Sequence, residues 1–270
     1  SAYQKRLVNK AMDDDRLSYG PLTAQFERLW ADMHSVKYAL FCNSGTSALQ
    51  VALHALKDKY GWKDGDEVLI PSVTFVATMN IVLHNNMKPV LVDVDMDTYN
   101  LDPTKIKDHI TKKTRCIIPV HLLGQPCQMD KIMRIAKRHG LKVIEDSCET
   151  VGATYEGRSV GSFGDISCFS TYASHLVVTG VGGFACTSDP DLAIRIKGLY
   201  NHGRDGIYHS IDDDDKNPVQ MIASRFNFVH SGYSYRATEL ESALGLGHLK
   251  RFGKELKKRQ ANAKYLIGKL

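Results

Sequence analysis

The sequence predicts an α/β protein in which helices are layered on a mostly parallel sheet, and three observations support this. Short apolar segments alternate with helical patterns of roughly 10 to 15 residues along most of the chain. Residues 89–94 read as a strand that is apolar except for Asp93, the kind that is buried on both faces of a sheet. Polar side chains follow several strands, at the carboxyl ends where such sheets bind ligands.

The elements follow one another in order, and several have a clear local signal. Apolar residues recur at helical spacing over residues 22–34. Asp102-Pro103 supplies an N-cap and a first-turn proline for a further helix. A long helix near the C-terminus contains small residues that permit close packing, namely Ala243, Gly245 and Gly247. Other helices are expected at 3–11, 48–56, 77–85, 129–139 and 190–200, and strands at 38–41, 67–70, 116–120, 141–145 and 184–187.

Composition excludes several classes of protein. The 270 residues are 43% hydrophobic, which is enough for a sizeable core, and the net charge of +5 comes from scattered Lys and Arg. That distribution does not indicate nucleic-acid binding. The six Cys are widely spaced, so we expect neither a metal site nor disulfides, and a reducing cytoplasm fits. No apolar run reaches the roughly 18 residues of a membrane span, and no signal peptide opens the chain.

Two polar segments are candidate binding sites at the start of helices or the end of strands. Asn43-Ser44-Gly45-Thr46-Ser47 joins a strand to a helix, so its glycine, helix amides and hydroxyls could form an anion cradle or an ordinary N-cap. It matches no nucleotide-binding motif. Glu145-Asp146-Ser147-Cys148-Glu149 ends an apolar strand, and a carboxylate there could be a metal ligand, a general base, a partner for a protonated heterocycle or a helix cap.

An aromatic residue and a loop are two further candidates. Phe75, in Pro71-Ser72-Val73-Thr74-Phe75, could stack on a planar ring or pack in the core. The stretch from Cys168 to Gly183 reads as a strand, a polar loop with Ser170 and His175, and a glycine turn. A scaffold that holds a polar loop between two apolar strands is a frequent place for chemistry, although a lone histidine is more often structural. The acidic run at residues 212–215 reads as a solvated loop.

In this order, the segments resemble the DegT/DnrJ/EryC1/StrS sugar aminotransferase family, fold-type-I enzymes that use pyridoxal phosphate. The resemblance covers nearly the whole chain and implies a three-layer α/β/α fold with a mixed seven-stranded sheet. Residues 1–248 would form the large cofactor domain and 249–270 the start of a linker helix and a small C-terminal domain, which is largely absent. Because the chain begins and ends inside helical patterns, we expect further segments beyond both ends. The matching segments are 17–21, 44–49, 71–78, 92–95, 119–124, 145–147, 161–165, 169–183, 232–236 and 238–239.

The resemblance also implies roles for individual residues. Gly45 and Thr46 would bind the cofactor phosphate, Ser170 would also reach the cofactor, at the phosphate in many members, and Ser44 is a further cofactor-binding residue. Phe75 would stack on the pyridine ring. Asp146 would pair with the pyridinium nitrogen, and Glu149 would lie next to the ring hydroxyl. Ser234 takes the place of an asparagine that reaches the phosphate of the partner subunit, so a homodimer is expected, with residues 203–235 supplying the loop that crosses. No metal is implied.

One departure from the family pattern bears on the reaction. The family's Schiff-base lysine falls at His175, and imidazole cannot form that covalent bond, so the cofactor would be bound non-covalently. A histidine there is the hallmark of the 4-keto-6-deoxy-sugar 3-dehydratases, and the resemblance is to the type that dehydrates GDP-4-keto-6-deoxymannose with pyridoxamine phosphate and glutamate. The iron–sulfur type uses clustered cysteines, which this chain lacks.

The expected function is therefore dehydration of a nucleotide-linked 4-keto-6-deoxy sugar, with His175 as the base. Two alternatives remain open at this point. The chain could be a nucleotide-sugar aminotransferase with a divergent active site, or a non-catalytic relative that binds the cofactor.

Overall fold

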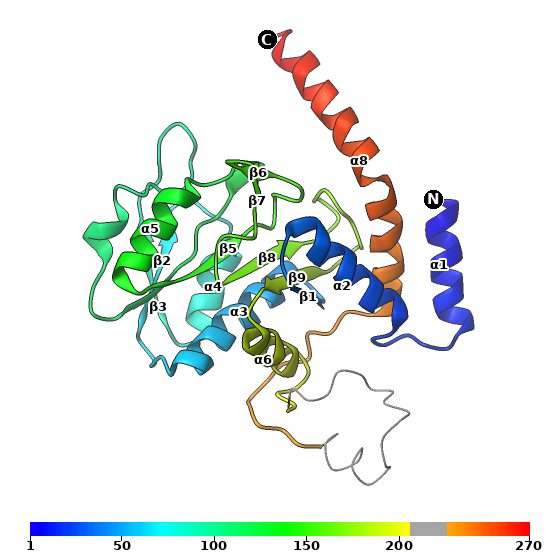
Figure 1. Ribbon diagram of the computed structural model, residues 1–270, viewed down its shortest axis with the longest axis horizontal. Helices are drawn as coiled ribbons and strands as arrows, with labels where there is room; N and C mark the ends of the chain where they lie inside the picture. The colour runs from blue at the N-terminus through cyan, green and yellow to red at the C-terminus, as the bar shows by residue number, and fades with distance from the viewer. Residues whose placement is uncertain (206–225) are drawn as a thin grey trace.

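A seven-stranded mixed sheet forms the centre of the molecule (Figure 1). The computed structural model describes residues 1–205 and 226–270, so the acidic run at 212–215 lies outside the described residues. The strand order is β1-β9-β8-β5-β4-β2-β3. Only β9 runs antiparallel to its neighbours, and the remaining pairs are parallel, which confirms the predicted α/β class. The strands are β1 (Tyr38–Cys42), β2 (Glu67–Pro71), β3 (Lys88–Val92), β4 (Thr114–Ile117), β5 (Lys142–Asp146), β8 (Ile166–Ser170) and β9 (Gly183–Thr187).

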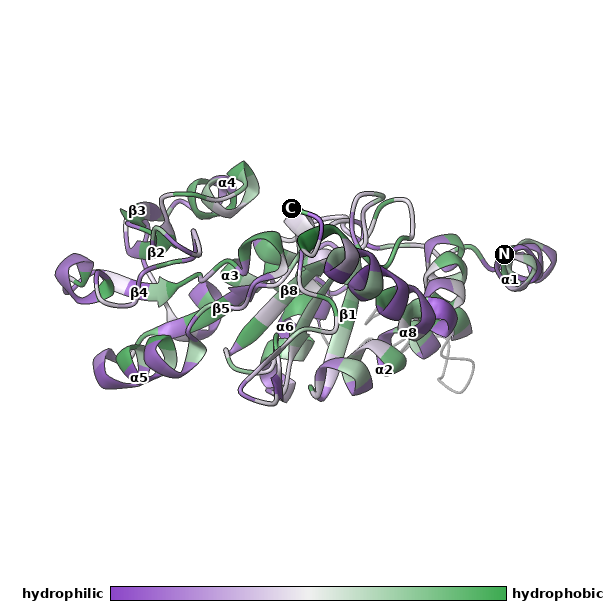
Figure 2. Cartoon of the chain, turned by 90° about the horizontal axis from the view of Figure 1, so that it is seen from above, coloured by the Kyte–Doolittle hydropathy of each residue, from purple (hydrophilic) through white to green (hydrophobic). Residues whose placement is uncertain are grey.

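Helices cover both faces of this sheet, because successive residues of each strand point to opposite sides. Leu40 and Cys42 of β1 pack in a core with α3, α4 and α6, whereas Ala39 and Phe41 pack in a second core with α2. A third core joins α5 to the β2, β4 and β5 side chains on its own face. In Figure 2 the strands β1 and β8 are largely green, purple residues gather on α5 and α8, and α4 is mostly green. The helices are α2 (Pro21–His34), α3 (Gly45–Tyr60), α4 (Val76–His84), α5 (Met129–His139) and α6 (Pro190–Tyr200).

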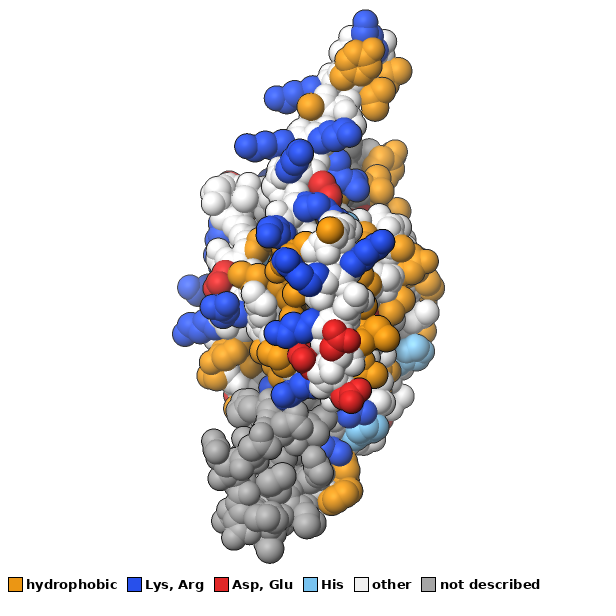
Figure 3. All heavy atoms as spheres, turned by 90° about the vertical axis from the view of Figure 1, so that its right-hand side faces the viewer, with side chains coloured by type: hydrophobic (Ala, Val, Ile, Leu, Met, Phe, Trp, Pro, Cys, Tyr) orange, Lys and Arg blue, Asp and Glu red, His pale blue; other side chains and the backbone are white. Residues whose placement is uncertain are grey.

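Two further helices, α1 (Ala2–Asp13) and α8 (Glu239–Ile267), pack against each other beside α2. The small residues of α8 make this approach possible, as the sequence predicts. A Cβ atom on Gly245 would lie 2.3 Å from the Phe26 ring, and one on Gly247 would lie 2.0 Å from the side chain of Gln4. The outer half of α8 is exposed and displays lysine and arginine side chains along its length (Figure 3).

Two predicted elements differ in the structure. Residues 89–94 do not form a strand buried on both faces: β3 is the edge of the sheet, and the side chain of Leu91 is 51% exposed. The helix expected after Asp102-Pro103 is reduced to a 3₁₀ turn, η1 (Ile106–His109). The Asp102 carboxylate accepts hydrogen bonds from the amide and hydroxyl of Thr104, which favours a turn over a longer helix.

The structure also bears on metal and disulfide chemistry. All six cysteines are free. Within residues 1–205 and 226–270, no three His, Cys, Asp or Glu side chains are grouped so as to hold a metal ion. None of the helices in the described part of the chain combines the length and apolar character that a membrane crossing requires.

Candidate active site

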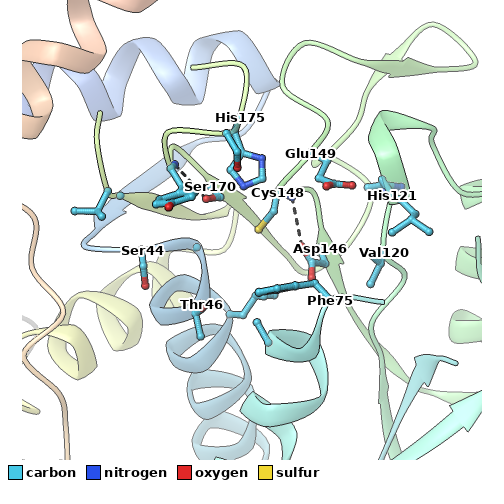
Figure 4. Close-up of a pocket in the computed structure, with 18 residues that line it drawn as sticks. Ser44, Thr46, Phe75, Val120, His121, Asp146, Cys148, Glu149, Ser170 and His175 are labelled. Carbon is cyan, nitrogen blue, oxygen red and sulfur yellow. Dashed lines mark hydrogen bonds between the residues drawn. The ribbon is translucent and has the colours of Figure 1, made fainter. Parts of the chain in front are cut away.

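A cavity of about 430 Å³ opens at the carboxyl ends of the central strands, where the sequence places its polar segments (Figure 4). Its walls come from the start of α3, the start of α4, the ends of β4, β5 and β8, and the loop after β8. The cavity brings together eight of the nine predicted site residues: Ser44, Gly45, Thr46, Phe75, Asp146, Glu149, Ser170 and His175.

The first wall is the N-terminus of α3. Ser44 is its N-cap, and its hydroxyl oxygen accepts a 3.0 Å hydrogen bond from the Ser47 amide. The amides of Gly45 and Thr46 belong to the first turn, whose N–H groups have no partner inside the helix. A Cβ atom on Gly45 would lie 2.8 Å from the Ser170 side chain, so only glycine permits this approach. The free amides and the positive end of the helix dipole suit an anion.

The second wall is the end of β5, where Asp146 points into the cavity. Its Oδ2 accepts a 2.9 Å hydrogen bond from the Thr78 hydroxyl, and its Oδ1 accepts one of 3.3 Å from the Cys148 amide. Burial raises the pKa of Asp146, and these two donors oppose that shift. A buried carboxylate held this way is ready to pair with a cationic group placed in the cavity.

The neighbouring carboxylate, Glu145, is committed to the fold. It is fully buried and accepts hydrogen bonds from the amides of Gly161, Phe163 and Gly164, at 2.8, 2.7 and 2.7 Å. Its Oε2 also lies 3.3 Å from Nε2 of the buried His121. Because the Cys127 amide donates to Nδ1 of His121, the ring hydrogen sits on Nε2 and faces Glu145.

Phe75 is not a core residue, because 71% of its side chain is exposed. It precedes α4 as the N-cap residue and lines the cavity. An exposed aromatic ring beside a cavity can stack on a planar ligand.

His175 lies on the loop after β8, on the far side of the cavity from Phe75 (Figure 4). Partial burial lowers its pKa, whereas the nearby charges of Glu149 and Asp146 act in the opposite direction. The Glu149 carboxylate accepts a 2.5 Å hydrogen bond from the Leu123 amide, which holds it at this wall. A neutral imidazole beside two carboxylates can accept and return a proton near neutral pH.

The ninth predicted residue, Ser234, is not among the residues that line this cavity. Its side chain is exposed, and its hydroxyl accepts a 3.2 Å hydrogen bond from Arg236. The structure also adds residues that sequence reasoning did not select. They share a position at strand ends or in the loop after β8, which is the signal that could have identified them: Val120, His121, Leu122, Cys148, Tyr172, Ser174, Val181 and Gly182.

Known proteins provide a comparison for this arrangement. The sequence model described as the DegT/DnrJ/EryC1/StrS aminotransferase family matches residues 2–270. The GDP-perosamine synthase of Caulobacter vibrioides is 41% identical over 258 residues, which cover 95% of this chain and 64% of that protein. The dTDP-4-dehydro-2,6-dideoxy-D-glucose 3-dehydratase of Saccharopolyspora spinosa is 36% identical over 247 residues, covering 87% and 54%.

Solved structures agree on the fold. An aminotransferase from Psychrobacter cryohalolentis superposes with a TM-score of 0.88 at 36% identity, covering 98% of this chain and 65% of that one. The E. coli GDP-4-keto-6-deoxy-D-mannose-3-dehydratase with bound hydrated PLP gives a TM-score of 0.90 at 28% identity, covering 100% and 70%. The chain spans just under two thirds of the length of the first curated relatives, at 64%, 65% and 62%.

Proposed function

The chain belongs to the DegT/DnrJ/EryC1/StrS aminotransferase family, and from that membership we propose that it uses pyridoxal or pyridoxamine phosphate to act on a nucleotide-linked sugar. We further propose that the reaction is 3-dehydration of a 4-keto-6-deoxy sugar. One observation carries this second step. The described residues that line the cavity include His175 but no lysine, so the usual covalent attachment point is missing there.

The cavity residues fit the cofactor. Its phosphate would bind at the α3 N-terminus, where a glycine lets β9 pack closely against the start of the helix: a Cβ atom on Gly183 would lie 2.4 Å from the Gly45 amide nitrogen. Asp146, with a pKa raised by burial, would pair with the pyridinium nitrogen and keep it protonated. Phe75 would cover one face of the ring. Glu149 and Ser170 line the same cavity.

When bound, the aminated cofactor supplies an amine for the C4 ketone of the sugar and a ring that accepts electrons. His175 would take the proton at the cofactor C4′ carbon and donate a proton to the hydroxyl that leaves C3 of the sugar. Its lowered pKa keeps the imidazole neutral, and so able to accept that proton, near neutral pH. Glutamate would serve as the amino donor that regenerates the cofactor.

The product distinguishes 3-dehydration from transamination. Incubation with a nucleotide-linked 4-keto-6-deoxy sugar, the cofactor and glutamate should yield ammonia, 2-oxoglutarate and a 3-deoxy sugar, without an amino sugar. His175→Gln should abolish dehydration while retaining cofactor binding. If His175→Lys retained full dehydration and gave no transamination, His175 would not be the base.

A second candidate is a nucleotide-sugar aminotransferase with a divergent site. It is supported by the GDP-perosamine synthase of Caulobacter vibrioides, whose identity of 41% exceeds the 36% of the Saccharopolyspora spinosa dehydratase. Accumulation of an amino sugar in the same incubation would establish it and exclude the dehydratase.

We also propose a homodimer in which Ser234 serves the cofactor of the partner subunit. Two observations support this. Ser234 is exposed, and it does not line the cavity of its own subunit. Native mass spectrometry tests the assembly, and Ser234→Ala in the dimer should weaken cofactor binding by the loss of one hydrogen bond, roughly 1 kcal/mol.

A further inference from the structure

The loop that carries His175 is closed at its base by two buried threonines. We define the His175 loop as residues 171–182. Its ends are held together by backbone hydrogen bonds from the Thr171 amide to the Gly182 carbonyl and from the Thr179 amide to the Thr171 carbonyl, both 2.9 Å. A surface loop whose ends meet in this way is compact and is held by its own contacts.

The two threonine side chains add a directed chain of hydrogen bonds. The Thr179 hydroxyl lies 2.6 Å from the Val181 carbonyl oxygen, which can only accept, so Thr179 donates to it. The Thr171 hydroxyl lies 2.6 Å from the Thr179 hydroxyl and can therefore donate to the Thr179 oxygen. Both side chains are buried, at 0% and 2% exposure, where such bonds are not exchanged with water.

The atoms around this threonine pair are closely packed, so a side chain at Gly182 would not fit. Gly182 adopts φ +151°, and a Cβ atom there would lie 2.5 Å from the Thr171 hydroxyl and 2.6 Å from the Thr179 hydroxyl. Val177, between His175 and Thr179, is fully buried in the core beside α2. The loop is thus attached to the core on the C-terminal side of His175, and by the threonine pair at its base.

Within the loop, His175 is placed by a single turn. Its amide donates a 3.0 Å hydrogen bond to the Tyr172 carbonyl, directly after Thr171. Tyr172, Ala173 and Ser174 are exposed, so the core does not hold this side of the loop. The position of His175 therefore depends on the base of the loop and on Val177.

We propose that Thr171 and Thr179 are positioning residues, which set how deeply His175 enters the cavity. The functional meaning of this role rests on the proposed use of His175 as the base. The charged groups that face the imidazole are Glu149 and Asp146, both from the end of β5 and the segment after it. A displaced loop would change both the burial of the ring and its distance from these carboxylates.

The test follows the titration of His175 by NMR in the protein without substrate, with its signal assigned through His175→Gln. In Thr179→Val, which removes the hydroxyl but keeps the shape, we expect the pKa of His175 to move from its lowered value toward the ordinary value of about 6.5. Thr179→Ser, which keeps the hydroxyl, should restore the wild-type titration. In turnover, Thr179→Val should lower kcat about tenfold with little change in KM, as a displaced catalytic group does.

A matched control separates positioning from general loss of stability. Thr187 on β9 is also buried, and its hydroxyl donates a 2.8 Å hydrogen bond to the Asp165 carbonyl away from the loop. Thr187→Val should leave the His175 titration unchanged. Thr171→Val provides a second variant should Thr179→Val fail to fold. An unchanged His175 titration in folded Thr179→Val or Thr171→Val would overturn the proposal, whether or not the protein proves to be a dehydratase.

Discussion

Replacing Asp146 with asparagine should keep or raise the stability of the free protein and should weaken cofactor binding. Asparagine has the same shape, and its amide can keep both contacts: the oxygen accepts from the Cys148 amide, and the Thr78 hydroxyl accepts from the nitrogen. Burial raises the pKa of Asp146, so the charged carboxylate costs stability at neutral pH. The folded variant should therefore be at least as stable as the wild type in thermal unfolding at that pH.

Cofactor binding should weaken in the same variant. A hydrogen bond between charged groups contributes about 1.5 to 3 kcal/mol, so the Kd for pyridoxal phosphate should rise roughly 10- to 150-fold in Asp146→Asn. Titration of the bound chromophore measures both the Kd and the protonation of the ring. Unaltered affinity and an unaltered chromophore titration would refute the pairing of Asp146 with the ring nitrogen. A large loss of unfolding temperature would instead show that the carboxylate is a structural group.

Three further predictions concern pH and packing. Burial raises the pKa of Glu27 to about 7 from 4.5. The free energy of unfolding should therefore fall by about 3 kcal/mol as the pH rises through that interval. Denaturant titrations should show this fall in the wild type and not in Glu27→Gln. Gly245→Ala places a methyl group against the Phe26 ring and should lower stability by about 1–3 kcal/mol, whereas Gly253→Ala on the same helix, which meets no atom within 4 Å, should not. The pKa of His175 is lowered from its ordinary value, so kcat/KM should begin to fall on acidification only once the pH is below ~6.5. A decline on acidification that begins above this pH would contradict a neutral His175 base.

The sequence was sufficient to predict the class of the sheet, and eight of the nine candidate site residues line one cavity at its edge. Strand ends and helix starts are local signals, and parallel strands carry their carboxyl ends to one edge. Asp146 and the start of α3 are therefore placed together by topology alone. Phe75 could not be assigned from its type, because an aromatic side chain suits a core and a binding site equally, and only its exposure distinguishes them.

Other features depend on tertiary context that one sequence does not contain. Apolar content does not tell an edge strand from a central one, and β3 lies at the edge with Leu91 exposed. His121 lines the cavity, but its ring is held by Glu145 and by the Cys127 amide. Glu145 is distant in the sequence, and a backbone amide leaves no signal in the residue types. The threonine pair below His175 likewise forms only when the loop closes.

The adjacent acids of β5, Glu145 and Asp146, lie on opposite faces of the sheet and in different environments. Glu145 is enclosed by backbone amides on one face of the sheet, and Asp146 faces the cavity on the other. An insertion of one residue in β5 ahead of the acids would put the glutamate at the position that faces the cavity, and a deletion of one residue there would put the aspartate at the position enclosed by the amides. The turn at Gly140, before the strand, could absorb such a change without moving either acid. Length variation among natural or engineered variants should therefore be tolerated at that turn and excluded from the five residues of β5.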